Sequence, residues 1–241
     1  VLTGMGWTPG ISNILALKGA GELDEVEEIN ISWAGSSSDA TGLAVVLHTI
    51  HIFTGRVTSF KSGKKVEVLA GSGKEKVEFV EPLGTVDMYH LGHPEPVTLP
   101  LYIPAVQTVT LKGGLKESSL NTLAIIVARL GLTNTRKKKQ AMGAILKKFL
   151  PVFEKFVKPA VPMSAIRVDI KGHREGKRQH IVYQAADHMN NLTGVPLAIG
   201  ALMLGKGEIK RTGVFAPEAA IDPDAFIQAL SQRNIKVTRT Q

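Results

Sequence analysis

The sequence contains no cysteine among its 241 residues. This absence excludes disulfide bonds, thiolate metal sites and cysteine nucleophiles within the chain. No run of about 18 apolar residues is long enough to span a bilayer, and no charged segment followed by an apolar stretch marks an export leader. We therefore expect a cytoplasmic protein with no membrane partner.

Aromatic residues are also scarce, at 5% of positions, although the net charge of +8 raises the question of nucleic-acid binding. Such binding favours basic residues that are clustered and interleaved with aromatic ones. The densest basic run, Arg136 to Lys139, instead opens an amphipathic helix, where lysines are commonly solvated. We predict no nucleic-acid partner, and a small acidic ligand as the better use of the remaining positive charge.

With 44% hydrophobic residues, the chain can bury a sizeable core. Apolar periodicity predicts helices over Ile11–Glu22, Ala40–Phe53, Ser118–Leu130, Arg136–Phe156, Val195–Leu204 and Asp222–Arg233. Short alternating or apolar runs predict strands over Glu28–Trp33, Val57–Phe60, Val66–Leu69, Val77–Phe79, Val106–Leu111, Ala165–Ile170 and Gln179–Gln184. Because several strands follow one another, the predicted fold class is α+β, with a mixed, partly antiparallel sheet covered by helices.

Two of these elements carry more detailed expectations. The last two strands alternate across the polar turn Gly172–Lys177, which predicts a long β-hairpin. Ser36–Asp39 supplies N-cap side chains for the strongly apolar helix Ala40–Phe53, which we expect to be buried.

The chain opens with VLTGMGWTPGISN, a glycine-rich stretch that loosely matches a dinucleotide-binding loop. Its context does not fit. Only three residues precede Gly4, too few for a buried strand, and the next strand runs into Ala34 and Gly35 instead of ending in an acidic residue. Pro9 also lacks the N–H group that a phosphate loop would supply. The residues themselves disfavour a phosphate site.

A metal site is one reading of two histidine pairs that are each three residues apart, His48 with His51 and His90 with His93. No acidic residue completes a helical ligand motif, so we predict no metal site. Nor does any G-x-S-x-G turn point to a serine nucleophile.

Two further segments could present side chains to a ligand. Prolines fix the backbone on both sides of Glu95 in the stretch Gly92–Pro96, although a plain connection between strands explains it equally well. Thr193 and Gly194 precede the helix that contains Pro196, where free N–H groups suit a carboxylate, and an ordinary N-cap is the alternative.

Together these pieces resemble the saccharopine dehydrogenase family, in the part that follows its N-terminal Rossmann domain. The resemblance rests on Gly6–Asn13, Leu91–Pro100, Thr193–Pro196 with its helix, and Gly207–Ile209 running into Gly213–Glu218. These stretches span nearly the whole chain in the family's order. In that family the first stretch is the hinge between the cofactor domain and the second domain. The resemblance thus identifies the glycine stretch as a boundary and residues 1–241 as one C-terminal domain without the Rossmann half.

The resemblance implies an oxidoreductase of lysine metabolism that acts on the C–N bond of an amino acid with NAD or NADP. The second domain would supply substrate contacts and a homodimer interface, for which the helix Ala40–Phe53 and the hairpin offer suitable faces. The isolated domain would be inactive, and we expect it to bind no cofactor alone.

The matching loops should line the seam where nicotinamide and substrate meet. We assign Thr8, Pro9 and Gly10 to cofactor contacts. The substrate contacts that we assign are Asn13, His93, Glu95, Thr193 and Gly194. His93 is the one candidate proton donor or acceptor, since an unperturbed imidazole titrates near neutrality. We expect Thr193 to share one cleft with Asn13 and the His93–Glu95 loop.

Two other functions stay open at this point. A non-catalytic binding or assembly module could retain the same fold, and it would differ in lacking a G-x-G-x-x-G segment upstream. A basic nucleic-acid-binding domain would show a steep salt dependence of its DNA affinity.

Overall fold

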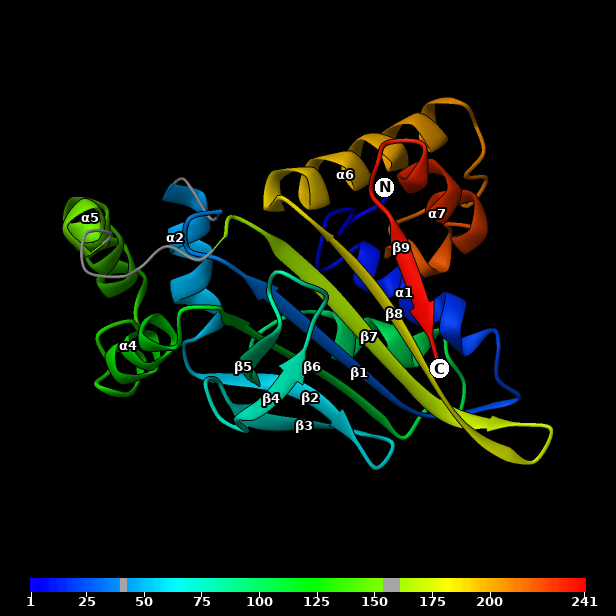
Figure 1. Ribbon diagram of the computed structural model, residues 1–241, viewed down its shortest axis with the longest axis horizontal. Coiled ribbons are helices and arrows are strands. Elements are labelled where there is room, and N and C mark those ends of the chain that lie inside the picture. Colours follow the sequence, from blue (N-terminus) through cyan, green and yellow to red (C-terminus); the bar gives the residue numbers. More distant parts are fainter. Residues whose placement is uncertain (40–42, 154–160) are drawn as a thin grey trace.

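The computed structural model describes residues 1–39, 43–153 and 161–241. Its strands form one sheet in the order β3-β2-β6-β1-β7-β8-β9, with β5 beside β6 and β4 beside β5. Only β1 and β6 pair in parallel, and the other strand pairs are antiparallel. The predicted α+β fold class, with a mixed and partly antiparallel sheet, is therefore confirmed (Figure 1).

The bounds of the elements are as follows. The strands are β1 (Glu25–Gly35), β2 (Arg56–Lys61), β3 (Lys64–Leu69), β4 (Glu75–Glu78), β5 (Thr85–His90), β6 (Thr108–Leu115), β7 (Ser164–Arg174), β8 (Lys177–Asp187) and β9 (Val237–Thr240). The helices are α1 (Ile11–Ala20), α2 (Leu43–Ile52), α3 (Glu95–Thr98), α4 (Ser118–Arg129), α5 (Arg136–Phe153), α6 (Met189–Gly205) and α7 (Pro223–Ser231), with 3₁₀ turns η1 (Leu99–Leu101) and η2 (Pro217–Ala219).

The predicted hairpin is confirmed and longer than expected. Its strands pair from Ser164–Asp187 to Arg174–Lys177, so the turn consists of only Glu175 and Gly176. Both turn residues have positive φ, which matches the right-handed twist of the strands. The polar residues Gly172–Lys177 are therefore mostly strand, and the predicted turn was too long.

The two faces of the sheet differ in chemistry because side chains alternate along each strand. Along β1, Ile29 and Ile31 are buried in the main core, beneath α1, α6 and α7. Asn30 and Ser32 point to the other face, which those helices leave uncovered. Helices α2, α4 and α5 gather instead at one end of the sheet (Figure 1).

Other expectations are corrected by tertiary contacts. The helix expected over Ala40–Phe53 is described from Leu43 on, because residues 40–42 lie outside the described residues, and His48 and His51 are exposed, so it is only half buried. The last residues of the helix expected to reach Phe156 also lie outside the described residues. Short strands β5 and β9 and the helix α3 were not predicted.

Within the described residues, the helices are all too short or too polar to cross a bilayer.

Candidate functional site

The N-terminal glycine stretch folds back on itself through its own backbone. The Thr8–Pro9 peptide bond is cis, the Gly6 N–H donates to the Pro9 carbonyl at 2.9 Å and the Ile11 N–H donates to the Gly6 carbonyl at 3.0 Å. Gly10 has φ of +134°, and a Cβ there would lie 2.1 Å from the Gly6 oxygen. The N–H groups of Gly6, Gly10 and Ile11 are therefore bonded within the segment and are not free to hold a phosphate.

An aromatic cavity of about 500 Å³ opens beside this loop. Its walls include four rings that meet edge to face. Trp7 contacts Trp33 at 5.4 Å between ring centroids, Trp33 contacts His93 at 6.0 Å, and His93 contacts His48 at 5.5 Å. Most of the remaining lining is apolar, with Thr8, Thr49, Asn190 and Thr193 as polar members. Such a mixture suits a small organic ligand that carries a few polar groups.

The register of β1 against β6 places the Trp33 ring in the wall. Trp33 is paired with Gly113, and a Cβ on Gly113 would lie 2.1 Å from Cε2 of the indole. Only glycine leaves room for the ring to lie flat over β6 at this point. The sequence therefore builds the cavity wall from a tryptophan and a glycine that are 80 residues apart.

Several polar atoms in this wall lack a hydrogen-bond partner. Within the described part of the chain, Nε1 of Trp7, Nε1 of Trp33 and Nε2 of His93 are buried without one. Each unpaired polar group costs about 1–3 kcal/mol relative to a satisfied one. Three of the nine such atoms in the described residues belong to this one cavity lining, which favours a functional site there over plain core.

The two wall histidines are neutral at physiological pH. Burial lowers the pKa of His93 to about 4, against a smaller opposite effect of the Thr8 backbone. The His48 side chain is exposed overall, but its ring packs against the His93 ring, and the resulting desolvation, together with the nearby His93 and His51 rings, lowers the pKa of His48 to about 4. The unperturbed pKa near neutrality, for which His93 was chosen as proton donor or acceptor, therefore does not apply to the buried ring. Its role in proton transfer stays a prediction.

Glu95 and Asn13 lie behind the cavity wall and hold the loop. The Thr8 hydroxyl donates to Oε1 of Glu95, and the Ser12 hydroxyl approaches the same oxygen at 2.7 Å. Asn13 accepts from the Gly10 N–H at 2.9 Å and donates to Glu218 at 2.9 Å. Burial raises the pKa of both the Glu95 and the Glu218 carboxyl, against the hydrogen bonds they accept.

The helix expected to start after Thr193 and Gly194 in fact begins at Met189. Its first N–H group, on Met189, donates to Asp39 at 2.7 Å, and the same carboxylate accepts from Ser164 and contacts His188. Thr193 and Gly194 therefore lie inside α6, and the predicted anion site at a helix start is wrong. The Asp39 side chain, expected to cap the following helix, contacts the start of α6, and residues 40–42, where the expected helix would start, lie outside the described residues.

The structure thus brings together only part of the predicted site. Thr8, Pro9, His93 and Thr193 line the aromatic cavity. Gly10, Asn13, Glu95 and Gly194 do not line it. Of the cleft that we expected Thr193 to share with Asn13 and the His93–Glu95 loop, only Thr193 and His93 lie together in the cavity lining. Which of these residues contact a substrate or cofactor stays a prediction.

Sequence reasoning missed the aromatic wall. Trp7 and Trp33 are the only tryptophans in the chain, and each lies within two residues of a glycine. Rare, large aromatic residues beside glycines could have indicated this cavity. The described residues contain no cluster of three or more histidine or acidic side chains that could hold a metal ion.

Comparison with known proteins gives one family. The model for the saccharopine dehydrogenase C-terminal domain matches residues 6–235. A curated relative, carboxyaminopropylagmatine dehydrogenase from Synechocystis sp., is 24% identical over 97% of this chain. The chain spans 63% of the length of that relative.

A solved structure shares the fold. Apo saccharopine dehydrogenase (L-Glu forming) from Saccharomyces cerevisiae matches all of this chain and 74% of its own, with a TM-score of 0.62 and 15% identity.

Proposed function

The chain belongs to the family of saccharopine dehydrogenase C-terminal domains, and from that premise we propose that it is the substrate-binding and dimerisation domain of an NAD(P)-dependent oxidoreductase. The reaction would oxidise or reduce the C–N bond of an amino acid. Both proteins named by the comparisons are dehydrogenases. A nucleotide-binding half outside these 241 residues is part of the proposal.

The aromatic cavity is the observation that carries this proposal. Its apolar rings exclude water from a reacting C–N carbon, which strengthens the few polar contacts that a ligand makes. The hydroxyl groups of Thr8 and Thr193 can hydrogen-bond an amino or carboxylate group of the substrate. The neutral His93 ring can accept or donate one hydrogen bond but is a weak base at neutral pH.

The nicotinamide would supply or accept the hydride, and Thr8 and Pro9, which line the cavity, are the residues that we propose would contact it. The glycine loop is a poor match for the dinucleotide's phosphates, because the N–H groups of Gly6, Gly10 and Ile11 are bonded within it. The cavity thus suits the reacting ring, while the phosphates need the other half of the enzyme.

The two tryptophans make the cavity directly observable, since both line it. We would titrate the chain with saccharopine, with L-glutamate and L-lysine for comparison, and follow tryptophan emission. Saturable quenching that Thr193→Val weakens would support a substrate site. Thr122→Val is the matched control, because Thr122 is an exposed helical threonine on α4 that lies outside the cavity, so the same substitution there should leave the titration unchanged.

No emission change with any of these compounds, with or without NADH, would contradict the proposal and favour a non-catalytic module. Calorimetry provides a second check. We expect no micromolar binding of NADH or NADPH to this chain alone, and such binding would contradict the assignment of the phosphates to another half.

The dimer contact that we propose is the outward side of α6. Leu197, Leu202 and Leu204 are 58%, 48% and 42% exposed, and α6 contains no charged residue from Met189 to Gly205. Two copies can therefore meet there without like-charge repulsion, and exposed apolar patches of this kind mark interfaces. We had expected the hairpin and the helix that contains α2 to offer the dimer faces. The hairpin, however, ends in charged residues, and α2 already packs on α5.

Sedimentation velocity tests this contact. We expect the chain to be dimeric and Leu197→Glu to be monomeric. Leu69→Glu, an equally drastic change at an exposed leucine of the edge strand β3, should leave the dimer intact. A wild-type monomer, or equal effects of both variants, would contradict the proposal.

A further inference from the structure

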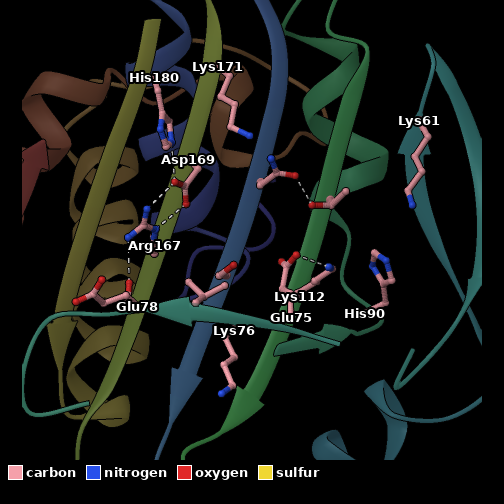
Figure 2. Close-up of a pocket in the computed structure, with 14 residues that line it drawn as sticks. Lys61, Glu75, Lys76, Glu78, His90, Lys112, Arg167, Asp169, Lys171 and His180 are labelled. Atoms are coloured by element: carbon pink, nitrogen blue, oxygen red, sulfur yellow. Dashed lines mark hydrogen bonds and ion pairs between the residues drawn. The ribbon is translucent and has the colours of Figure 1, made fainter. Parts of the chain in front are cut away.

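A second hollow, the sheet groove, lies on the face of the sheet opposite the main core helices. It has a volume of about 420 Å³. Its floor consists of side chains from β1, β6 and β7, and β4 crosses over it (Figure 2). The floor is polar where a packed sheet would be apolar, since it contains Asn30, Ser32, Thr110 and Lys112. An all-polar floor does not suit a dry protein contact, whereas it suits a small polar ligand.

Internal bonds hold the groove's acidic groups. Asp169 accepts two hydrogen bonds from Arg167, at 2.7 and 2.8 Å, and contacts His180 at 2.8 Å. Glu75 is paired with Lys112 at 2.8 Å. On the floor, the Thr110 hydroxyl donates to Asn30 at 2.6 Å. These contacts fix the walls of the groove. Two of its three carboxylates, those of Asp169 and Glu75, therefore already have a cationic partner.

Cations outnumber carboxylates, since five lysine or arginine side chains line the groove against three acidic ones. Within the described residues Lys61 has no ion pair. Lys171 pairs with Glu28 at 3.1 Å, and both side chains are about one third exposed, so this pair is weak. Figure 2 shows Lys61 and His90 on one side of the groove and Lys171 at one end.

The positive field acts on a buried ring. His90 is only 6% exposed. Burial first, and then the charges of Lys112 and Lys61, lower the pKa of His90 to about 4, against a smaller opposite effect of Glu75. The lysines therefore outweigh the nearby carboxylate at this ring, and an anion placed there would be attracted.

We infer that the sheet groove binds a small anion through a carboxylate or phosphate group, held between Lys61, Lys112 and the His90 ring. The bound oxyanion would take the ammonium group of Lys61 as its first partner and share Lys112 with Glu75. This site is separate from the aromatic cavity, because the two share no lining residue. Anion binding at this site does not depend on the dehydrogenase function proposed above.

The test uses the chain labelled at histidine, with the NMR signals of its seven histidines assigned. We would titrate inorganic phosphate and, separately, citrate at constant ionic strength set with sodium chloride. We expect a saturable shift of the His90 signal with at least one of them, while the His93 signal stays fixed. A response to phosphate alone or to citrate alone identifies the chemistry of the group that is bound.

Lys61→Met and Lys64→Met form a matched pair. The two lysines are paired directly across β2 and β3, both are exposed, and only Lys61 lines the groove. We expect Lys61→Met to weaken binding about fivefold, the size of one exposed ion pair, and Lys64→Met to change it by less than about twofold. No saturable shift with either anion, or equal losses in both variants, would overturn the inference.

Discussion

The aromatic cavity and the sheet groove lie against opposite faces of the same strands, and they differ in how their polar groups are satisfied. On β6, Gly113 lies under the Trp33 ring of the cavity, while its neighbour Lys112 points into the groove. The cavity contains buried ring nitrogens without partners, whereas four of the groove's eight charged side chains form two ion pairs with one another, Arg167 with Asp169 and Lys112 with Glu75. The same alternation that separates core from surface in any strand thus separates the aromatic cavity from the charged groove.

The largest expected effect is on the cavity side of β6. Gly113→Val would place a side chain within 2.1 Å of the Trp33 ring, so the wall must shift, and we expect a loss of about 3 kcal/mol in the free energy of unfolding. Thr110→Val on the groove side removes one hydrogen bond and should cost only about 1 kcal/mol. Urea unfolding measures both. Equal losses would remove the contrast between the faces.

A smaller effect is expected behind the cavity wall. Glu95→Ala leaves the hydroxyl groups of Thr8 and Ser12 without their acceptor, which should cost about 2 kcal/mol. Glu95→Gln keeps an acceptor oxygen and should cost less than about 1 kcal/mol at pH 5. If Ala and Gln variants are equally stable by thermal unfolding, then Glu95 does not hold the loop.

The pH dependence of the folding stability gives a second test of the role of Glu95. Because burial raises the pKa of Glu95 above the ordinary 4.5, the folded chain binds this proton more tightly than the unfolded chain, and stability falls as pH rises from about 4.5 to the raised value. Glu95→Gln abolishes this loss. The stability of the variant relative to wild type should therefore improve between pH 4 and pH 8 in denaturant titrations. A constant difference would show that Glu95 titrates normally.

The smallest effect compares one histidine from each region. His93 and His90 both have a pKa of about 4, but burial alone lowers the first, while lysine charges contribute to the second. Salt screens charges and does not change burial. Raising sodium chloride from about 0.05 to 0.5 M should raise the pKa of His90 by a few tenths of a unit and that of His93 by less. Histidine NMR titrations measure both values, and equal shifts would contradict the electrostatic account of the groove.

Local sequence patterns predicted most of the fold. The hairpin strands alternate over enough residues to reveal their period, and the final helix begins at an aspartate followed by proline, where Asp222 accepts the Ala225 N–H at 2.8 Å. Short strands such as β9 carry too few residues for any period to show. The start of α6 was predicted wrongly for a different reason, because its first turn contains two asparagines and no apolar repeat.

The candidate site was predicted less completely. The resemblance to the family placed Thr8, Pro9, His93 and Thr193 in one site, and all four line the aromatic cavity. The sequence could not show that Glu95 is buried behind them, because a carboxylate between two prolines has the same sequence whether it faces solvent or core. Nor could it show the Trp33 wall, which depends on the pairing of β1 with β6.

The sequence by itself determined the α+β class, the long hairpin and the helix ends that have their own capping residues, because these depend on neighbours within one or two turns of chain. Tertiary structure alone decided where α6 begins, since its capping carboxylate, Asp39, is 150 residues away from Met189. It also decided the pKa of His93, because the cost of charging a ring depends on the atoms that surround it in space.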